Sequence, residues 1–230
     1  MKNMDPTVAT VASSEHYRGS LGARYFEWQN RNADITGRIE ARKFRSYIRS
    51  GDVVLDFGCG GGHVLGSLKC ARRLGVEVNP VARAEAVKHG IECYESLEEI
   101  PDGCIDVAIS NHALEHVIHP IGILKELRKK LKENGILTLC LPIDDWRVER
   151  HFDPSDINHH LHTWTSQLLG NSLCEAGFQA GQFSIRVLTH AWFPGTVRVF
   201  DRMPERVFDV LCCLYSVLVK RRQLFAAVRT

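Results

Sequence analysis

Short, mostly apolar runs alternate with helical stretches from about residue 53 onward. The runs lie at 53–57, 74–78, 91–94, 105–110 and 136–141. Short apolar runs bounded by turn signals are typical of strands that are covered on both faces. The alternation therefore predicts a parallel sheet built from βαβ units.

Capping signals delimit the helices between these runs. Asn79 is a suitable N-cap, Pro80 suits a first helical turn, and Gly90 is a stop signal. A polar stretch at 144–163 interrupts the pattern, and so long a connection inside a compact domain is usually functional. Further helices are predicted at 33–48, 121–133 and 165–176, with another strand at about 179–187.

The pattern divides a single domain into three parts. Residues 1–50 are predicted to form an N-terminal helical cap region, residues 51–190 the core, and residues 191–230 a C-terminal extension of the same domain. The chain shows no internal repeat and no linker that would separate a second domain. Its 230 residues suffice for one compact domain with a sizeable core.

Charge and cysteine usage exclude several classes of protein. Lys and Arg number 29 against 27 Asp and Glu, so the net charge of +2 creates no strong field for nucleic acid or anionic membrane. The eight cysteines form no CxxC pair and lie mostly in apolar runs, which indicates reduced, buried thiols rather than zinc ligands. The N-terminus lacks a secretory signal and no run of about 18 apolar residues is present, so we expect a cytoplasmic protein.

The strongest chemical signal is the glycine cluster at 58–62, directly after the first apolar run. Glycines let backbone N–H groups approach a ligand, and the helix that follows presents its N-terminus there. The spacing fits neither G-x-G-x-x-G nor a phosphate loop, because His63 stands three residues after Gly60 and no Gly-Lys-Ser/Thr follows. Glu77 ends the next run, 19 positions after Gly58 (77 − 58), where a carboxylate can accept both hydroxyls of a ribose. Together these features predict a site for a nucleoside that carries no phosphate.

These residues resemble the class I S-adenosylmethionine (SAM)-dependent methyltransferases, in particular the type 11/12-like small-molecule methyltransferases. The resemblance covers about residues 50–187. It implies an α/β fold with a Rossmann-like, doubly wound sheet of seven strands, the last antiparallel, between an N-terminal helical region and a C-terminal helical extension. It also implies SAM as the cofactor. The matching segments are VVLDFGCGGG (53–62), GVEVNP (75–80), DVAISNHALEHV (106–117) and GILTLCLP (135–142).

The resemblance also assigns roles around the glycine cluster. Asp56 would hold the amino group of the methionine end of SAM, Glu77 would bind the ribose, and Val78 and Leu97 would pack on adenine. Ser96 stands where many relatives have an acid for the adenine amino group, which a hydroxyl holds less firmly than a carboxylate. The other cofactor-binding candidates line the turn or end the fourth apolar run; they are Gly58, Cys59, Gly60, Gly62, Asn111 and His112.

Methyl transfer depends mainly on alignment of donor and acceptor, and it needs a general base only where the acceptor loses a proton. Four of the eleven histidines lie at 144–163, a stretch that leaves the carboxyl end of the fifth apolar run. Histidine suits proton transfer at neutral pH, so His160 or His162 is predicted to act as base or to orient the acceptor. The same histidines could ligate a divalent ion with Asp144, Asp145, Asp153 and Asp156. No diagnostic metal spacing is present, and we predict no metal.

The segment 207–219 is mostly apolar and is followed by Lys220-Arg221-Arg222. A helix of this length would span roughly 20 Å, too little to cross a bilayer. The interpretation we favour is a helix that packs on the domain or on a second subunit of a homodimer. The alternative is weak contact with an anionic membrane surface through this C-terminal segment.

The sequence therefore predicts a SAM-dependent methyltransferase for a small-molecule or lipid- or glycan-linked acceptor, with oxygen as the expected acceptor atom. The alternative is a SAM-binding regulatory or scaffold protein without turnover. Tyr17 and Tyr25 are expected to close over the cofactor. Nucleic acid is disfavoured as a partner by the near-neutral charge, and because residues 111–114 are not an Asn-Pro-Pro-aromatic tetrad.

Overall fold

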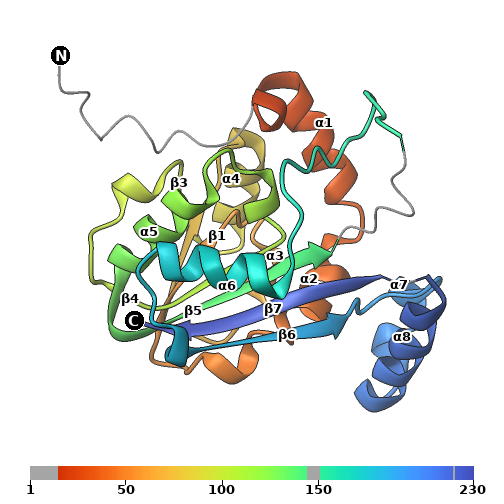
Figure 1. Ribbon diagram of the computed structural model, residues 1–230. Helices are drawn as coiled ribbons and strands as arrows, with labels where there is room; N and C mark the ends of the chain where they lie inside the picture. Colours follow the sequence, from red (N-terminus) through yellow and green to blue (C-terminus); the bar gives the residue numbers. More distant parts are fainter. Residues whose placement is uncertain (1–14, 144–150, 220) are drawn as a thin grey trace.

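The computed structural model describes residues 15–143, 151–219 and 221–230, which form a mixed seven-stranded sheet with helices on both faces (Figure 1). The strand order is β3-β2-β1-β4-β5-β7-β6. Neighbours from β3 to β5 are parallel, whereas β7 is antiparallel to both β5 and β6. This confirms the predicted doubly wound sheet with an antiparallel last strand. The strands are β1 Val53–Phe57, β2 Arg72–Val76, β3 Glu92–Tyr94, β4 Ile105–Asn111, β5 Leu131–Ile143, β6 Phe183–Thr189 and β7 Arg222–Arg229.

Alternate residues of the strands face two different layers of helices. Leu55 of β1 packs in the larger core with helices α5 and α6, whereas its neighbour Val54 packs with the layer of α3 and α4 and the segment after α2. A continuously apolar strand is what this double cover requires. The helices are α1 Gly19–Gln29, α2 Ala33–Ala41, α3 His63–Gly66, α4 Pro80–Lys88, α5 Pro120–Lys130, α6 Ser166–Glu175, α7 Thr196–Val199 and α8 Glu205–Val219.

The prediction that the core ends near residue 190 is wrong, because β7 runs through the sheet between β5 and β6. Phe225 is 1% exposed, lies opposite Cys140 of β5, and contacts the rings of Phe44 and Tyr47. The segment 191–230 therefore contains a core strand after its two helices. The apolar run of β7 is short, and it pairs with strands that are distant in sequence, so the local pattern did not identify it as a core strand.

Other elements also differ from the predicted bounds; β5 begins at Leu131, α5 ends at Lys130 and β6 covers Phe183–Thr189. The predicted helix 33–48 ends at Ala41, and a 3-10 turn, η3 Arg45–Tyr47, follows it. The second strand begins at Arg72 rather than residue 74, because Arg72 pairs with Glu92 of β3 at the exposed start of both strands. The strand ends at Val76, one residue before Glu77.

Helix α8 packs by one face only. Phe208, Cys212 and Ser216 repeat at helical spacing on its buried face, and Phe208 and Cys212 join a small core with Ile39. The opposite face is apolar and exposed, and α8 lies beyond the ends of β6 and β7 (Figure 1). Within the described part of the chain, no helix has both the length and the apolar character needed to span a membrane.

The placement of β7 in the sheet can be tested by measuring the stability of a variant. Replacing Phe225 by Ala removes a buried ring from the middle of the sheet, so the free energy of unfolding should fall by about 3–5 kcal/mol. Phe152 is 91% exposed, and Phe152→Ala should change stability by less than about 0.5 kcal/mol. Urea unfolding of both variants checks this, and equal stabilities would contradict the placement of β7.

Candidate active site

The glycine loop that follows β1 has a conformation that only glycine adopts easily. Gly58, Gly60 and Gly62 have φ angles of +74°, +52° and +81°. A Cβ atom on Gly58 would lie 2.4 Å from the Cβ of Ala113, so the loop also runs tightly against the segment after β4. The loop therefore brings its backbone to the carboxyl edge of the sheet, where open α/β sheets bind ligands.

Two carboxylates lie beneath this loop. Glu77, just after β2, accepts hydrogen bonds from the N–H of Gly60 (2.9 Å to Oε2) and the N–H of Asn79 (2.8 Å to Oε1). Asp56 of β1 is 2% exposed, and its Oδ1 has no hydrogen-bond partner among the described residues. A buried carboxylate oxygen of this kind is suited to a cationic or hydrogen-bonding ligand.

Burial shifts the pKa of both acids upward. Burial raises the pKa of Asp56 well above its usual value, and the nearby charge of Glu77 adds to the shift. Burial also raises the pKa of Glu77, although the N–H groups of Asn79 and Gly60 oppose it. Negative charge on Asp56 and Glu77 is therefore unfavourable unless a bound ligand supplies a positive charge or hydrogen-bond donors.

Two cavities meet at the loop. A small cavity of about 90 Å³ is lined by Val76, Glu77 and Val78 and is covered by Tyr17 and Tyr25. A larger cavity of about 750 Å³ lies between α2, the glycine loop and the ends of β4 and β5. Seven residues line both cavities; they are Tyr25, Phe26, Gln29, Gly58, Gly60, His112 and His116. A ligand in one cavity can therefore touch a ligand in the other.

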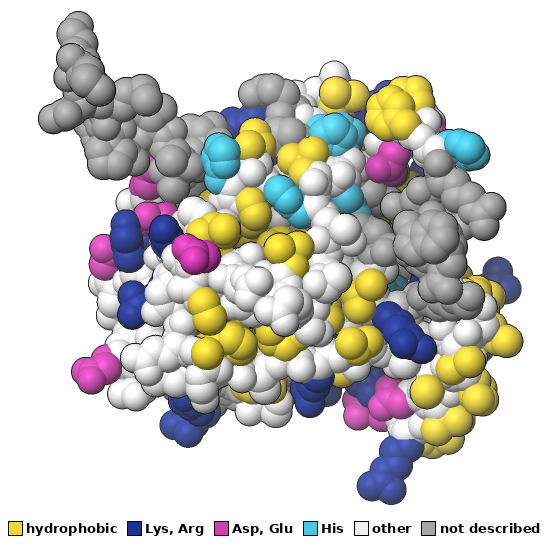
Figure 2. Space-filling model, in the orientation of Figure 1, with side chains coloured by type: hydrophobic (Ala, Val, Ile, Leu, Met, Phe, Trp, Pro, Cys, Tyr) yellow, Lys and Arg dark blue, Asp and Glu magenta, His cyan; other side chains and the backbone are white. Residues whose placement is uncertain are grey.

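The N-terminal region and the segment after residue 151 contact each other above these cavities. The His16 ring stacks on the His159 ring with centroids 4.5 Å apart. The Tyr17 hydroxyl donates to the carbonyl of Asn158 (2.6 Å) and lies 2.6 Å from Nδ1 of His116. Histidine side chains accordingly gather on the upper part of the face in Figure 2. This arrangement covers the small cavity and leaves the larger one bordered by imidazoles.

Glu115 is a site residue that the sequence analysis missed. Its side chain is fully buried, and neither carboxylate oxygen has a hydrogen-bond partner among the described residues. His112 Nδ1 lies 3.5 Å and His116 Nε2 lies 3.8 Å from its Oε1. The signal for it was an acid within the apolar run Ala113–Val117, next to a histidine.

The histidines beside Glu115 differ in charge. Burial opposes the charged form of His112, but its contacts with Cys140 and Glu115 outweigh burial and raise its pKa well above the usual value. Burial lowers the pKa of His116 to about 4, and burial likewise lowers the pKa of His190 to about 4. At neutral pH the charged form is thus favoured for His112 and the neutral form for His116 and His190.

A buried ion pair from α2 forms another part of this wall. Lys43 pairs with Glu40 and also donates to Oδ1 of Asn111 (3.1 Å) and Oε1 of Gln223 (3.2 Å). Burial would raise the pKa of Glu40, but Lys43 outweighs it and the pKa falls to about 2. Because Gln223 also lies 3.0 Å from Nε2 of His112, the last strand contributes directly to the site.

The structure brings most of the predicted site residues to the two cavities. Those that line at least one cavity are Asp56, Gly58, Cys59, Gly60, Glu77, Val78, Asn111, His112 and His160. Gly62 is the N-cap of α3 and lines neither cavity; a Cβ there would lie 2.3 Å from Cδ1 of Ile91. Asp144 and Asp145, named above as alternative metal ligands, fall outside the described residues.

Three predicted residues lie elsewhere. Ser96 caps the 3-10 turn η4 Leu97–Glu99 by accepting from the N–H of Glu98, and Leu97 is buried in the core. His162 places its Nε2 2.8 Å from the carbonyl oxygen of Val117. None of the three lines either cavity, so the structure gives them no place beside the glycine loop.

A comparison with known families places these residues in a known kind of domain. The model of the methyltransferase domain family matches residues 25–182, which include the glycine loop, Glu77, Glu115 and His160. The chain belongs to this family of methyltransferase domains. The matched range covers more than half of the chain.

Individual relatives agree with this assignment. The chain is 35% identical over 120 residues to ribosomal protein L11 methyltransferase of Thermosipho africanus, covering 47% of this chain and 45% of that protein. It is 31% identical over 166 residues to the tabtoxin biosynthesis enzyme of Pseudomonas amygdali pv. tabaci, covering 64% and 66%. The chain thus spans about half to two thirds of the length of these relatives.

The fold is also that of solved methyltransferases. A SAM-dependent methyltransferase of Thermotoga maritima, described as a possible histamine N-methyltransferase, superposes with a TM-score of 0.64. The match covers 90% of this chain and 95% of that one at 17% sequence identity. At this identity the likeness shows the shared fold alone.

The raised pKa of Asp56 predicts how stability varies with pH. The pKa of Asp56 is higher in the folded than in the unfolded protein, so the protonated side chain contributes fully to the free energy of unfolding below about pH 3.9. This contribution declines by up to about 1.4 kcal/mol per pH unit as the pH rises toward the folded pKa. Asp56→Asn removes this loss. The stability of the variant relative to wild type should therefore increase from about pH 4 to about pH 7 in urea unfolding.

Asp153→Asn is the matched control. Asp153 is an exposed acid whose pKa is lowered because Ser155 donates to it, so its replacement should bring no gain with rising pH. A stability difference between Asp56→Asn and wild type that stays constant with pH would contradict the raised pKa.

Proposed function

We propose that the enzyme transfers the methyl group of SAM to an oxygen of a small-molecule, lipid-linked or glycan-linked acceptor held in the larger cavity. The observation that carries this proposal is the meeting of the two cavities at Gly58, Gly60 and His112. The larger cavity, about 750 Å³, has the size of ordinary small-molecule sites. Its polar lining is suited to a hydroxylated acceptor.

The small cavity and the glycine loop would hold the cofactor. Asp56 lines the larger cavity beside the loop, and its buried oxygen, which has no partner among the described residues, is suited to the ammonium group of the methionine end. Glu77 and Val78 line the small cavity, where Glu77 would bind the ribose and Val78 would pack on adenine. The N–H groups of the loop lie between them. We assign no cofactor contact to Ser96 or Leu97, because both lie outside the cavities.

When bound, SAM supplies a methyl group on a sulfonium, which makes the carbon electrophilic. Transfer forms the O–CH₃ bond as the S–CH₃ bond breaks, and the acceptor hydroxyl must lose its proton. We assign proton removal to His160, which lines the larger cavity and contacts the His116 ring with centroids 5.0 Å apart. The buried carboxylate of Glu115 would stabilise positive charge on this group of imidazoles. His162 faces a backbone carbonyl instead, so we give it no role in proton transfer.

Two neighbouring histidines test this assignment. His160→Ala should lower kcat by about 100-fold or more, the usual contribution of a general base, while SAM affinity stays unchanged. His162→Ala should retain a rate close to wild type. The acceptor for these assays would come from a labelled-methyl screen of hydroxylated small molecules, glycans and quinol-like phenols. Equal rates for His160→Ala and wild type, with unchanged SAM affinity, would overturn the role of His160.

We further propose that the exposed face of α8 contacts an anionic lipid surface, which would suit a lipid-linked acceptor. Its acids point toward α2 and are neutralised there: Asp209 pairs with Arg42 (2.7 Å), and the preceding Asp201 pairs with Arg38 (2.7 Å). The exposed apolar residues of this face include Leu214 and Leu218. Figure 2 shows apolar side chains gathered over α8, with Lys and Arg side chains nearby. Exposed apolar residues together with arginines are typical of interfacial helices. Arg202, Arg206 and Arg222 are exposed and form no ion pair among the described residues.

Vesicle sedimentation tests this contact. Wild type should bind vesicles containing phosphatidylglycerol more tightly than neutral vesicles, and added salt should weaken the binding. Leu214→Asp should weaken it about tenfold or more, because a buried Leu contributes about 1.5–3 kcal/mol. Val87→Asp, on the exposed side of α4, should bind like wild type. A dimer that dissociates in Leu214→Asp, without any vesicle binding, would instead assign the face to a second copy of the chain.

A further inference from the structure

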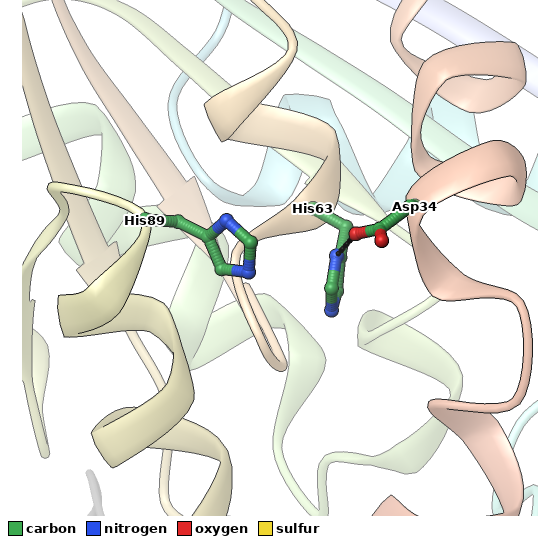
Figure 3. Close-up of side chains that lie close together, drawn as sticks. All are labelled: Asp34, His63 and His89. Carbon is green, nitrogen blue, oxygen red and sulfur yellow. Dashed lines mark hydrogen bonds and ion pairs between the residues drawn. The ribbon is translucent and has the colours of Figure 1, made fainter.

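Three potential metal ligands from separate elements meet beside the glycine loop. Asp34 lies in the first turn of α2, His63 begins α3, and His89 caps the end of α4. Their side chains point toward one another (Figure 3), and one ligand atom from each lies within 4.8 Å of the others. Nδ1 of His63 is 2.9 Å from Oδ1 of Asp34, and the two imidazole rings have centroids 4.7 Å apart.

We propose that Asp34, His63 and His89 bind a divalent transition-metal ion, with Zn²⁺ as the best match. Two imidazoles and one carboxylate are ligands that Zn²⁺ prefers, whereas Mg²⁺ and Ca²⁺ prefer oxygen alone. In a tetrahedral site with bonds of about 2.1 Å, ligand atoms lie about 3.4 Å apart. Metal binding would require Nδ1 of His63 and Oδ1 of Asp34, which lie 2.9 Å apart, to separate slightly. The His89 side chain, which is 33% exposed and lies 3.7 Å from Oε1 of Glu85, would need to move toward them.

The surroundings of His63 also fit a metal ligand. Its Nε2 lies 2.8 Å from Oδ1 of Asn30, so an Nε2–H can donate to Asn30 while Nδ1 faces Asp34. Metal-binding histidines usually donate their second ring N–H in this way, which fixes the tautomer and the ring orientation. Asn30 would therefore position His63 for the ion.

Close packing holds His63 between α2 and the loop. A Cβ on Gly37 would lie 2.6 Å from the Cβ of His63, and a Cβ on Gly61 would lie 2.9 Å from its Nε2. Only glycine allows this approach at both positions. A metal on the three ligands would consequently tie α2 and α4 to the end of the glycine loop. On the proposed function, which places SAM at that loop, the ion should also tighten SAM binding.

Calorimetric titration of the full chain with Zn²⁺, after removal of metal by a chelator, tests the site. Wild type should bind one Zn²⁺ per chain, and His89→Ala and Asp34→Asn should each weaken this binding by about 100-fold, since even outer partners of metal ligands contribute about 10- to 100-fold. His119→Ala is the matched control: His119 is exposed at the start of α5, outside the cluster, and this variant should bind like wild type.

A second group of potential metal ligands has to be distinguished from this site, and the variant His160→Ala does so. Ligand atoms of Glu115, His116 and His160 also lie within 4.8 Å of one another. If His160→Ala loses zinc while His89→Ala and Asp34→Asn keep it, the proposal is overturned and the ion belongs to the larger cavity. Zinc affinity unchanged in His89→Ala and Asp34→Asn overturns it equally. All of these measurements are made without SAM, so they decide the metal site whether or not the proposed function holds.

SAM affinity with and without Zn²⁺ then tests the coupling. Wild type should bind SAM at least about fivefold more tightly with Zn²⁺, the lower range of ordinary coupling between sites, and His89→Ala should show no such gain. Zinc binding at Asp34, His63 and His89 without any change in SAM affinity would contradict the coupling alone.

Discussion

The hydrogen bond from the Gly60 N–H to the carboxylate of Glu77 is the interaction on which the site depends. It joins the loop after β1 to the turn after β2, and Asn79 fixes the other oxygen of the same carboxylate. The loop can reach Glu77 only because glycine tolerates the positive φ of residues 58 and 60. This arrangement holds the carboxylates of Asp56 and Glu77 close together and buried, which makes negative charge on them unfavourable. A cationic ligand that carries hydroxyl groups would offset this.

The acceptor side of the site is built from segments far apart in the chain. Lys43 from the segment after α2, Asn111 from β4 and Gln223 from β7 form one buried hydrogen-bonded group. His112 joins it through Gln223 and faces the fully buried Glu115. The last strand therefore completes both the sheet and the wall of the larger cavity. Buried polar groups of this kind hold a fixed geometry when their partners are in place, as an in-line transfer requires.

Local signals explain what the sequence could predict. The glycine loop, Glu77 and the Asn79 cap each depend on neighbours a few residues away, and the strands through β5 followed from short apolar runs. The sequence could not reveal β7, because its apolar run at 224–228 is short and its pairing partners, β5 and β6, are distant in sequence. Nor could it pair Lys43 with Gln223, which are distant in sequence. His160 and His162 looked alike; they differ because the backbone of Leu161 and His162 is held to the carbonyl of Glu115, and only His160 reaches the cavity.

Calorimetric titration of wild type, Glu77→Ala and Glu92→Ala with SAM tests whether the carboxylate of Glu77 holds the cofactor. Glu92 is an exposed acid of β3 that pairs with Arg72 and lies outside both cavities. The account predicts one SAM per chain for wild type and Glu92→Ala, and a loss of about 100-fold or more in affinity for Glu77→Ala, since hydrogen bonds to a charged group contribute about 1.5–3 kcal/mol each. Equal SAM affinity in all three proteins would contradict it.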